Sequence, residues 1–144
     1  MISPPDFDGK GNWWSFMIDT GTEVGAISLK SSARAPGKAR KWLGGVFREQ
    51  KLGSDYVGRA VVTELVTNVY KHTDSELVSV RLLLEDGHLV VEVEDGSDGV
   101  PVVRDEDDTA ESGRGLLMMS LLVQDWGVRA LGNGGKVTWA RLGV

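Results

Sequence analysis

The sequence predicts an α+β fold, a two-layer sandwich in which helices cover one face of a mixed, mostly antiparallel sheet. Three observations support this prediction. Apolar residues recur at helical spacing in two long segments before residue 73 and in a third segment after residue 115. Segments that alternate between apolar and polar residues pair off around short turns. The 144 residues contain no internal repeat, and this length fits one compact domain.

The predicted elements follow in the order strand, two helices, hairpin, helix, hairpin. The first strand covers residues 24–29. Pro36 opens the first helix, 37–51, because its missing N–H costs nothing at that position. Asp55 is placed to cap a second helix that runs to about His72. The remaining elements are a hairpin of strands 77–84 and 88–94, a helix over 116–123, and a strand pair over 126–131 and 136–142.

Composition and charge exclude several classes of function. We expect a loose N-terminal tail over residues 1–22 and one domain over residues 23–144. The net charge of −5 argues against general nucleic-acid binding. The absence of cysteine excludes disulfides, cysteine nucleophiles and thiolate metal sites. No apolar run approaches the roughly 20 residues that span a bilayer, and no signal peptide is predicted. We therefore expect a cytoplasmic protein that contacts neither nucleic acid nor membrane directly.

The second predicted helix carries a polar stripe. Glu64, Asn68 and Lys71 are spaced i, i+4, i+7 and share one helix face. A carboxylate can take a proton from a hydroxyl, an amide oxygen is a suitable hard ligand for Mg²⁺, and a lysine neutralises phosphate. A solvated helix face explains the same spacing equally well. The stripe alone therefore leaves both interpretations open.

Two glycine-containing segments follow along the chain. A predicted strand ends at Asp95 and continues into Gly96-Ser97-Asp98-Gly99. A carboxylate at this position can accept a hydrogen bond from an exocyclic amine such as that of adenine, although an ordinary turn is the simpler interpretation. The segment Ser112-Gly113-Arg114-Gly115-Leu116 opens a predicted helix, whose N-terminal N–H groups and dipole suit phosphates. The acidic residues 105–108 between them are predicted to form a solvated loop.

Taken in this order, the motifs resemble those of the Bergerat-fold (GHKL) ATPase superfamily, which includes gyrase, Hsp90, histidine kinases and MutL. The segment from Glu64 to His72 resembles its N box. The segments from Asp95 to Gly99 and from Gly113 to Leu116 resemble its two glycine boxes. Trp126-Gly127 and residues 134–140 resemble the closing strands of one branch, the anti-sigma-factor serine/threonine kinases and their actinobacterial relatives. The resemblance covers about residues 24–142.

The resemblance implies ATP and Mg²⁺ as cofactors and assigns roles to individual positions. Glu64 matches the general base that activates the attacking hydroxyl, and Asn68 matches the Mg²⁺ ligand. Asp95 matches the residue that binds the adenine amine. The positions that the resemblance places at the nucleotide are Asn68, Lys71, Asp95, Gly99, Gly113, Arg114, Gly115, Leu116 and Thr138.

Two positions depart from the family pattern. Ser97 replaces the central glycine of the first glycine box, where a residue other than glycine tolerates positive φ poorly. Val137 and Thr138 are exchanged relative to the usual closing strand. Since side chains alternate along a strand, the Thr138 hydroxyl is expected on the opposite face of the sheet, where it would not help to hold adenine. Both changes are expected to weaken nucleotide binding.

The resemblance implies a protein that phosphorylates a STAS-type anti-anti-sigma factor, sequesters a sigma factor and works as a homodimer. The alternative is a binding module that regulates partners without phosphoryl transfer. An intact Glu64 favours the kinase, whereas Ser97 and the exchange at Thr138 favour the binding module. The aromatic residues Trp13 and Trp14, with Phe16, are expected either to form a dimer interface or to fold back over the domain's own sheet.

Overall fold

The computed structural model describes residues 21–96 and 111–143, without the side chains of residues 111–114. Within these ranges the elements are β1 (Thr22–Lys30), α2 (Ala35–Glu49), α3 (Tyr56–His72), β2 (Leu77–Glu85), β3 (His88–Asp95), α4 (Glu111–Leu122), β4 (Val123–Ala130) and β5 (Lys136–Leu142). None of the helices in the described ranges is long and apolar enough to cross a bilayer.

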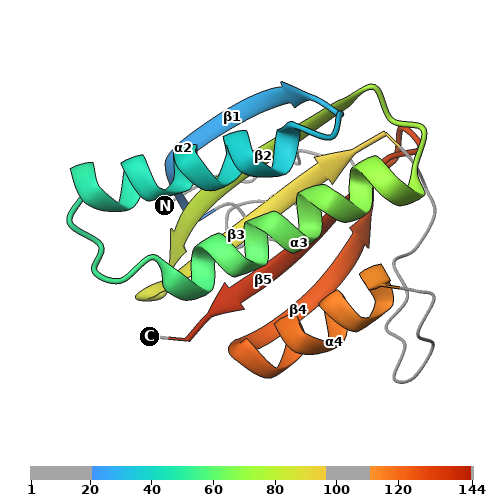
Figure 1. Cartoon of the computed structure of the whole chain (residues 1–144). Helices are drawn as coiled ribbons and strands as arrows, with labels where there is room; N and C mark the ends of the chain where they lie inside the picture. The colour runs from blue at the N-terminus through green and yellow to red at the C-terminus, as the bar shows by residue number, and fades with distance from the viewer. Residues whose placement is uncertain (1–20, 97–110, 144) are drawn as a thin grey trace.

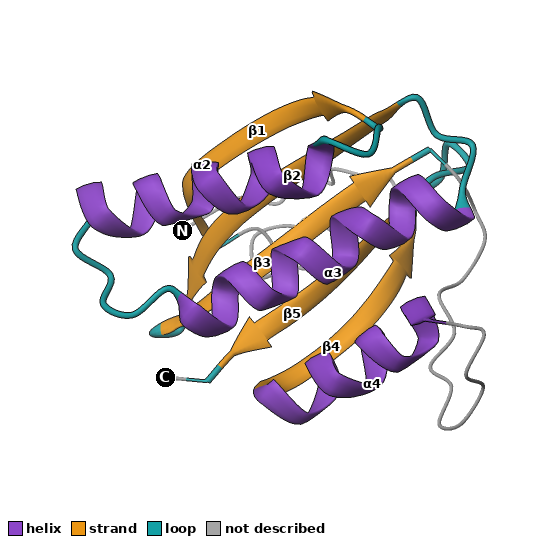
Figure 2. Ribbon diagram, viewed as in Figure 1, coloured by secondary structure: helices purple, strands orange, loops and turns teal. Residues whose placement is uncertain are grey.

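The five strands form one sheet in the order β1-β2-β3-β5-β4. Every described pairing is antiparallel, including that of β3 with β5, which are separated in sequence by α4 and β4. Figures 1 and 2 show that α2, α3 and α4 all cover the same face of this sheet. The predicted α+β sandwich is confirmed. The described strands are all antiparallel, whereas we expected a mixed, mostly antiparallel sheet.

The hydrophobic core lies between the sheet and the helices. On β2, Val78, Val80 and Leu82 are fully buried beneath the helices, whereas Ser79 and Arg81 alternate with them on the other face. Each buried valine or leucine contributes roughly 1.5–3 kcal/mol relative to an exposed one. The four residues that form the predicted core side of α3 are all buried, namely Val62, Leu65, Val66 and Val69.

The ends of α2 and α3 lie close to the predicted positions. Pro36 occupies the first turn of α2, which begins one residue earlier at Ala35. Asp55 is the N-cap residue of α3 but makes no side-chain capping hydrogen bond. Its carboxylate lies 3.9 Å from the Arg59 guanidinium instead. Asp55 therefore acts on α3 through its charge near the helix N-terminus rather than by a capping bond.

The largest difference from the predicted elements concerns α4. This helix begins at Glu111, so Gly113 and Gly115 lie inside it and not in a loop before it. The first N–H groups of a helix take no part in its hydrogen-bond ladder. Glycines in the first turn of α4 therefore destabilise the helix less than glycines in its interior would. The helix ends at Leu122 and β4 starts at the next residue, Val123, three residues before the predicted strand.

The predicted hairpin of β2 and β3 is confirmed, and its turn explains why it forms. Asp86 and Gly87 have φ values of 50° and 81°. Positive φ at both central residues is what a tight two-residue hairpin turn requires, and Asp-Gly is among the pairs that adopt it most readily.

The face of the sheet away from the helices carries a row of ion pairs. Glu92 on β3 is only 4% exposed, and its carboxylate accepts hydrogen bonds from Arg81 on β2 at 2.5 Å and from Arg129 on β4 at 3.3 Å. Burial disfavours the charge of Arg81. The hydrogen bond and attraction of Glu92, together with Glu23, outweigh burial and raise the pKa of Arg81 above its ordinary value. These contacts tie β2, β3 and β4 together on this face.

Some predictions lie outside the described residues. They concern Trp13, Trp14 and Phe16 in residues 1–20, and Ser97, Gly99 and the acidic residues 105–108 in residues 97–110. The predicted tail, 1–22, extends into β1 by one residue, because that strand begins at Thr22.

Candidate functional site

Segments that are far apart in sequence meet at one end of the sandwich. The C-terminal ends of α3 and β3 lie at the same end of the domain as the N-terminal ends of α4 and β5 (Figure 1). The hydrogen bond from the Gly96 N–H to the Ser75 Oγ, 2.9 Å long, joins the segment after β3 to the segment after α3. These four elements carry the predicted site residues that lie in the described ranges.

The polar stripe of α3 is not a solvated helix face. Asn68, its middle residue, is only 8% exposed, and neither its Oδ1 nor its Nδ2 has a hydrogen-bond partner within the described part of the chain. Glu64 is half-buried and Lys71 is exposed. A buried amide without partners costs roughly 1–3 kcal/mol, so Asn68 marks a place that a ligand would complete.

The second glycine segment lies directly against this stripe. A Cβ added at Gly115 would overlap the Glu64 carboxylate, so only glycine at position 115 leaves that carboxylate where it is. The neighbouring Leu116 is 2% exposed and belongs to the core, so its side chain does not line the site. The backbones of Gly113 and Arg114 lie in the first turn of α4. Of the sequence-predicted positions, Gly99 alone has neither backbone nor side chain in the described ranges.

Asp95, the last residue of β3, forms a buried ion pair with Lys136, the first residue of β5. The Lys136 Nζ lies 3.1 Å from Oδ1 and 3.0 Å from Oδ2 of Asp95, and the two side chains are 6% and 2% exposed. The two residues are direct partners in the β3–β5 register. Sequence reasoning gave Lys136 no role, because its contact with Asp95 depends on a strand pairing across 41 residues.

Thr138 lies on the same face of the sheet as Asp95. In the β3–β5 register Thr138 is opposite Val93 and Val137 is opposite Glu94. Val93 and Asp95 are two residues apart and share the helix-covered face, and Thr138 is 4% exposed there. Thr138 and Val137 therefore lie on opposite faces, as the exchange predicts, but the face of Thr138 is the one that also carries Asp95 and Lys136.

The loop before β5 approaches the end of β3 very closely. A Cβ added at Gly135 would overlap the main-chain oxygen of Asp95 and would lie 3.4 Å from the Gly96 Cα. Glycine at this position allows the two backbones to touch. This contact fixes Lys136, the next residue, beside Asp95.

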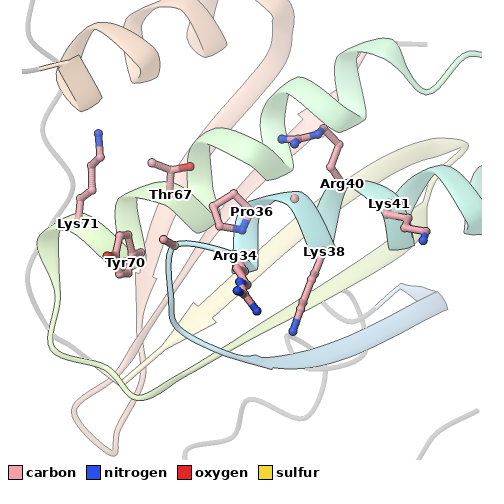
Figure 3. Close-up of a pocket in the computed structure, with 10 residues that line it drawn as sticks. Arg34, Pro36, Lys38, Arg40, Lys41, Thr67, Tyr70 and Lys71 are labelled. Atoms are coloured by element: carbon pink, nitrogen blue, oxygen red, sulfur yellow. The ribbon is translucent and has the colours of Figure 1, made fainter.

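A separate open depression of about 680 Å³ lies between α2 and the C-terminal half of α3 (Figure 3). Five cationic side chains line it, from Arg34, Lys38, Arg40, Lys41 and Lys71. Lys71 is the one predicted site residue among them, and in Figure 3 its side chain extends away from α2. Neither Glu64 nor Asn68 lines the depression.

The described residues offer no preformed metal cage. Within residues 21–96 and 111–143, no group of three or more His, Cys, Asp and Glu side chains could hold a metal ion. Mg²⁺ is commonly held by one or two protein oxygens together with the phosphates of a nucleotide. The buried, unpartnered amide of Asn68 fits such a partial site.

Comparison with known proteins places most of the chain in one family. The model of that family, described as the histidine kinase-like ATPase domain, matches residues 29–142. The match includes α3, the end of β3, and α4 with β5, which together form the site described above. Among curated proteins, none matches the chain.

Proposed function

Because the chain belongs to the histidine kinase-like ATPase domain family, we propose that it is a cytoplasmic ATP-binding anti-sigma factor and protein serine/threonine kinase of a partner-switching system. It would phosphorylate a STAS-type anti-anti-sigma factor and sequester a sigma factor. Family membership supports ATP binding, whereas the kinase step and the partners are the proposal. The observation that carries it is the Glu64 carboxylate held against Gly115, one helical turn from the buried amide of Asn68.

The residues at this end of the domain fit ATP with Mg²⁺. The Asn68 Oδ1 would hold the metal, and Asp95 would accept a hydrogen bond from the adenine amine. The first turn of α4, with Gly113 and Arg114, presents N–H groups that the helix ladder does not use, which favours phosphates there. Bound Mg²⁺ would neutralise charge on the phosphates. Lys71 would add a positive charge at the exposed edge of the site.

Glu64 would act as the general base of the transfer. Its carboxylate takes the proton of a serine or threonine hydroxyl on the partner. The hydroxyl oxygen bonds to the γ-phosphorus as the bond between that phosphorus and the ADP oxygen breaks. Gly115 leaves room for the carboxylate at this position, because any side chain there would displace it. Phosphoryl transfer depends mainly on such positioning and on electrostatic stabilisation.

The test is Glu64→Gln, an almost isosteric change that removes the ability to take the proton. We expect ATP affinity within about threefold of wild type and phosphoryl transfer to a STAS-type protein reduced roughly 10²- to 10⁴-fold. Calorimetry measures the first quantity, and transfer from γ-labelled ATP measures the second. The matched control is Glu94→Gln, on an exposed β3 residue of the opposite face, which should leave both unchanged.

The outcomes separate the kinase from its alternative. Transfer by Glu64→Gln at the wild-type rate would refute the base assignment. A wild-type chain that binds ATP but transfers phosphate to no STAS-type protein would support a binding module that regulates partners without phosphoryl transfer.

Exposed apolar side chains support the proposed protein partners. Met118 and Leu121 on α4 are 60% and 74% exposed, and neighbouring exposed apolar residues on a helix are a common feature of interaction surfaces. We also propose a homodimer. If Trp13 and Trp14 form its interface, replacing both with alanine should yield a folded monomer in sedimentation experiments. A wild-type chain that stays monomeric at high concentration would contradict the dimer.

A further inference from the structure

The open depression between α2 and α3 concentrates positive charge in a chain whose net charge is negative. Residues 30–41 contain five lysine and arginine side chains and no aspartate or glutamate, whereas the whole chain carries a net charge of −5. Four of those five cations line the depression together with one lysine of α3, namely Arg34, Lys38, Arg40, Lys41 and Lys71. Overall composition therefore does not account for this surface.

The stability of α2 does not explain these charges either. The N-terminal end of a helix carries a partial positive charge and favours acidic side chains. The first turn of α2 contains no acidic residue, and Arg34, its N-cap residue, makes no side-chain capping hydrogen bond. Lys38, the fourth residue of the helix, adds another cation. Cations in this position repel one another and the helix dipole, so α2 would be more stable without them.

The exposed cations of the depression have no acidic partner within the part of the chain that the structure describes. No carboxylate there forms an ion pair with Arg34, Lys38 or Lys41, and all three residues are exposed. On the neighbouring helix, by contrast, the Arg59 guanidinium lies 3.9 Å from the Asp55 carboxylate. The described fold thus leaves three positive charges to solvent or to a bound partner.

Arg40 connects the two helices that bound the depression. It is half-buried, and its Nη1 donates a hydrogen bond of 2.9 Å to the Thr63 Oγ1 on α3. Thr63 directly precedes Glu64, the proposed general base. Thr67, which also lines the depression (Figure 3), directly precedes Asn68. The helix that forms one wall of the depression therefore also carries the central residues of the candidate site.

We propose that this cationic depression docks an acidic segment of the protein that the kinase phosphorylates. The inference rests on the proposed function, because it takes the substrate protein as the occupant. A small-molecule site encloses most of its ligand, whereas this depression is open and fits a segment that protrudes from another protein. Opposite charges speed the encounter of two proteins and fix their relative orientation. Docking here would bring the substrate hydroxyl to the helix that carries Glu64.

The test removes two charges from the depression and, in a matched control, two charges from the other end of α2. The depression variant is Lys38→Gln with Lys41→Gln. The control is Arg48→Gln with Lys51→Gln, which changes the net charge equally at residues that are also exposed. The probe is a fluorescein-labelled octaglutamate peptide, followed by anisotropy. The depression variant should bind it about tenfold less tightly than wild type, the effect of two surface ion pairs, and the control should stay within about twofold.

Two further measurements separate docking from a structural role. With a STAS-type protein and γ-labelled ATP, the depression variant should raise KM about tenfold and leave kcat within about twofold, because it weakens binding and not the chemical step. Its melting temperature should not fall, because Lys38 and Lys41 oppose the dipole of α2. A lower melting temperature with an unchanged KM would mean that the two lysines serve the fold, and would overturn the inference.

The possible failures are distinguishable. Equal affinity of both variants for the peptide would overturn the docking role and leave the proposed function standing. If inorganic tripolyphosphate binds more tightly than the peptide and competes with it, a small phosphate ligand is the occupant, which also overturns the inference. Failure of ATP to bind the wild-type chain in calorimetry would overturn the proposed function, and with it the kinase substrate as the occupant.

Discussion

Two carboxylates on β3, three residues apart, lie on opposite faces of the sheet and are equally inaccessible. Glu92 and Asp95 are each 4% exposed. Glu92 is held by Arg81 and Arg129, whose side chains are 36% and 39% exposed. Asp95 forms an ion pair with Lys136, whose side chain is 6% exposed. The same kind of charge is thus stabilised by hydrated partners on one face and by a desolvated partner on the other.

The difference shows how a buried acid can be either structural or available to a ligand. The two arginines at Glu92 stay partly exposed, so less charge is removed from water there than at Asp95, although burial still disfavours the charge of Arg81. The arrangement at Asp95 removes both charges from water. The pair lies at the end of the domain where α3 ends and α4 begins. We infer that the outer face stabilises the sheet and the helix-covered face serves the nucleotide.

The strongest test of this comparison is to remove each carboxylate in turn. Asp95→Ala should abolish ATP binding, because the adenine amine loses its acceptor. It should also lower the free energy of unfolding by about 3–5 kcal/mol, because the buried Lys136 ammonium loses the carboxylate that faces it. Glu92→Ala should lower stability by less, because its arginines remain hydrated, and should not change ATP affinity. Unchanged affinity in Asp95→Ala, measured by calorimetry, would remove Asp95 from the site.

The second test adds one methyl group on each side of the sheet, first at Gly115 on α4 and then, as a control, at Gly127 on β4. Gly115→Ala should displace the Glu64 carboxylate and lower phosphoryl transfer roughly a hundredfold, the effect of misplacing a reacting group by about 1 Å. Its melting temperature should change little, since alanine favours the helix.

The control for this test is Gly127→Ala on β4. A Cβ there would lie 2.8 Å from the Trp139 ring, so we expect a lower melting temperature and normal transfer per folded molecule. Slower transfer from Gly127→Ala, and not from Gly115→Ala, would reverse the assignment of the two faces.

The sequence predicts well what depends on neighbouring residues. The turn at Asp86 and Gly87 follows from their tolerance of positive φ, and the buried side of α3 follows from apolar spacing. The spacing of the stripe could not reveal that Asn68 is buried, because that depends on what packs against α3. The pairing of Asp95 with Lys136 could not be predicted from the sequence either, because it depends on β3 and β5 being neighbours in the sheet.

A third test exchanges hydroxyl and methyl groups across β5. Thr138→Val should weaken ATP binding by about fivefold, the effect of losing one hydrogen bond between neutral groups. Val137→Thr, on the opposite face, should leave ATP affinity unchanged, although its buried hydroxyl should lower stability. Equal ATP affinity in wild type and Thr138→Val would show that Thr138 shares a face with Asp95 without contributing to binding.

The smallest effect is expected from the outer face alone. Arg129→Met removes the longer of the two hydrogen bonds to Glu92, 3.3 Å, from a side chain that is 39% exposed. Such contacts contribute less than about 1 kcal/mol. Urea unfolding should show this small loss, and it should diminish further at high salt. A loss of unfolding free energy as large as that of Asp95→Ala would mean that the contact of Arg129 with Glu92 is not weaker than the pair of Asp95 with Lys136.

The 41 residues that separate Asp95 from Lys136 also determine when the nucleotide end of the domain is complete. The contact requires β5 to pair with β3 across a long stretch of chain, and such non-local pairing slows folding. A ligand that bridges both strands binds only the finished arrangement. At a hundred times its dissociation constant, such a ligand adds about 2.7 kcal/mol of stability. That gain should appear as slower unfolding and not as faster folding. Bound nucleotide would therefore slow the loss of β5 from the sheet.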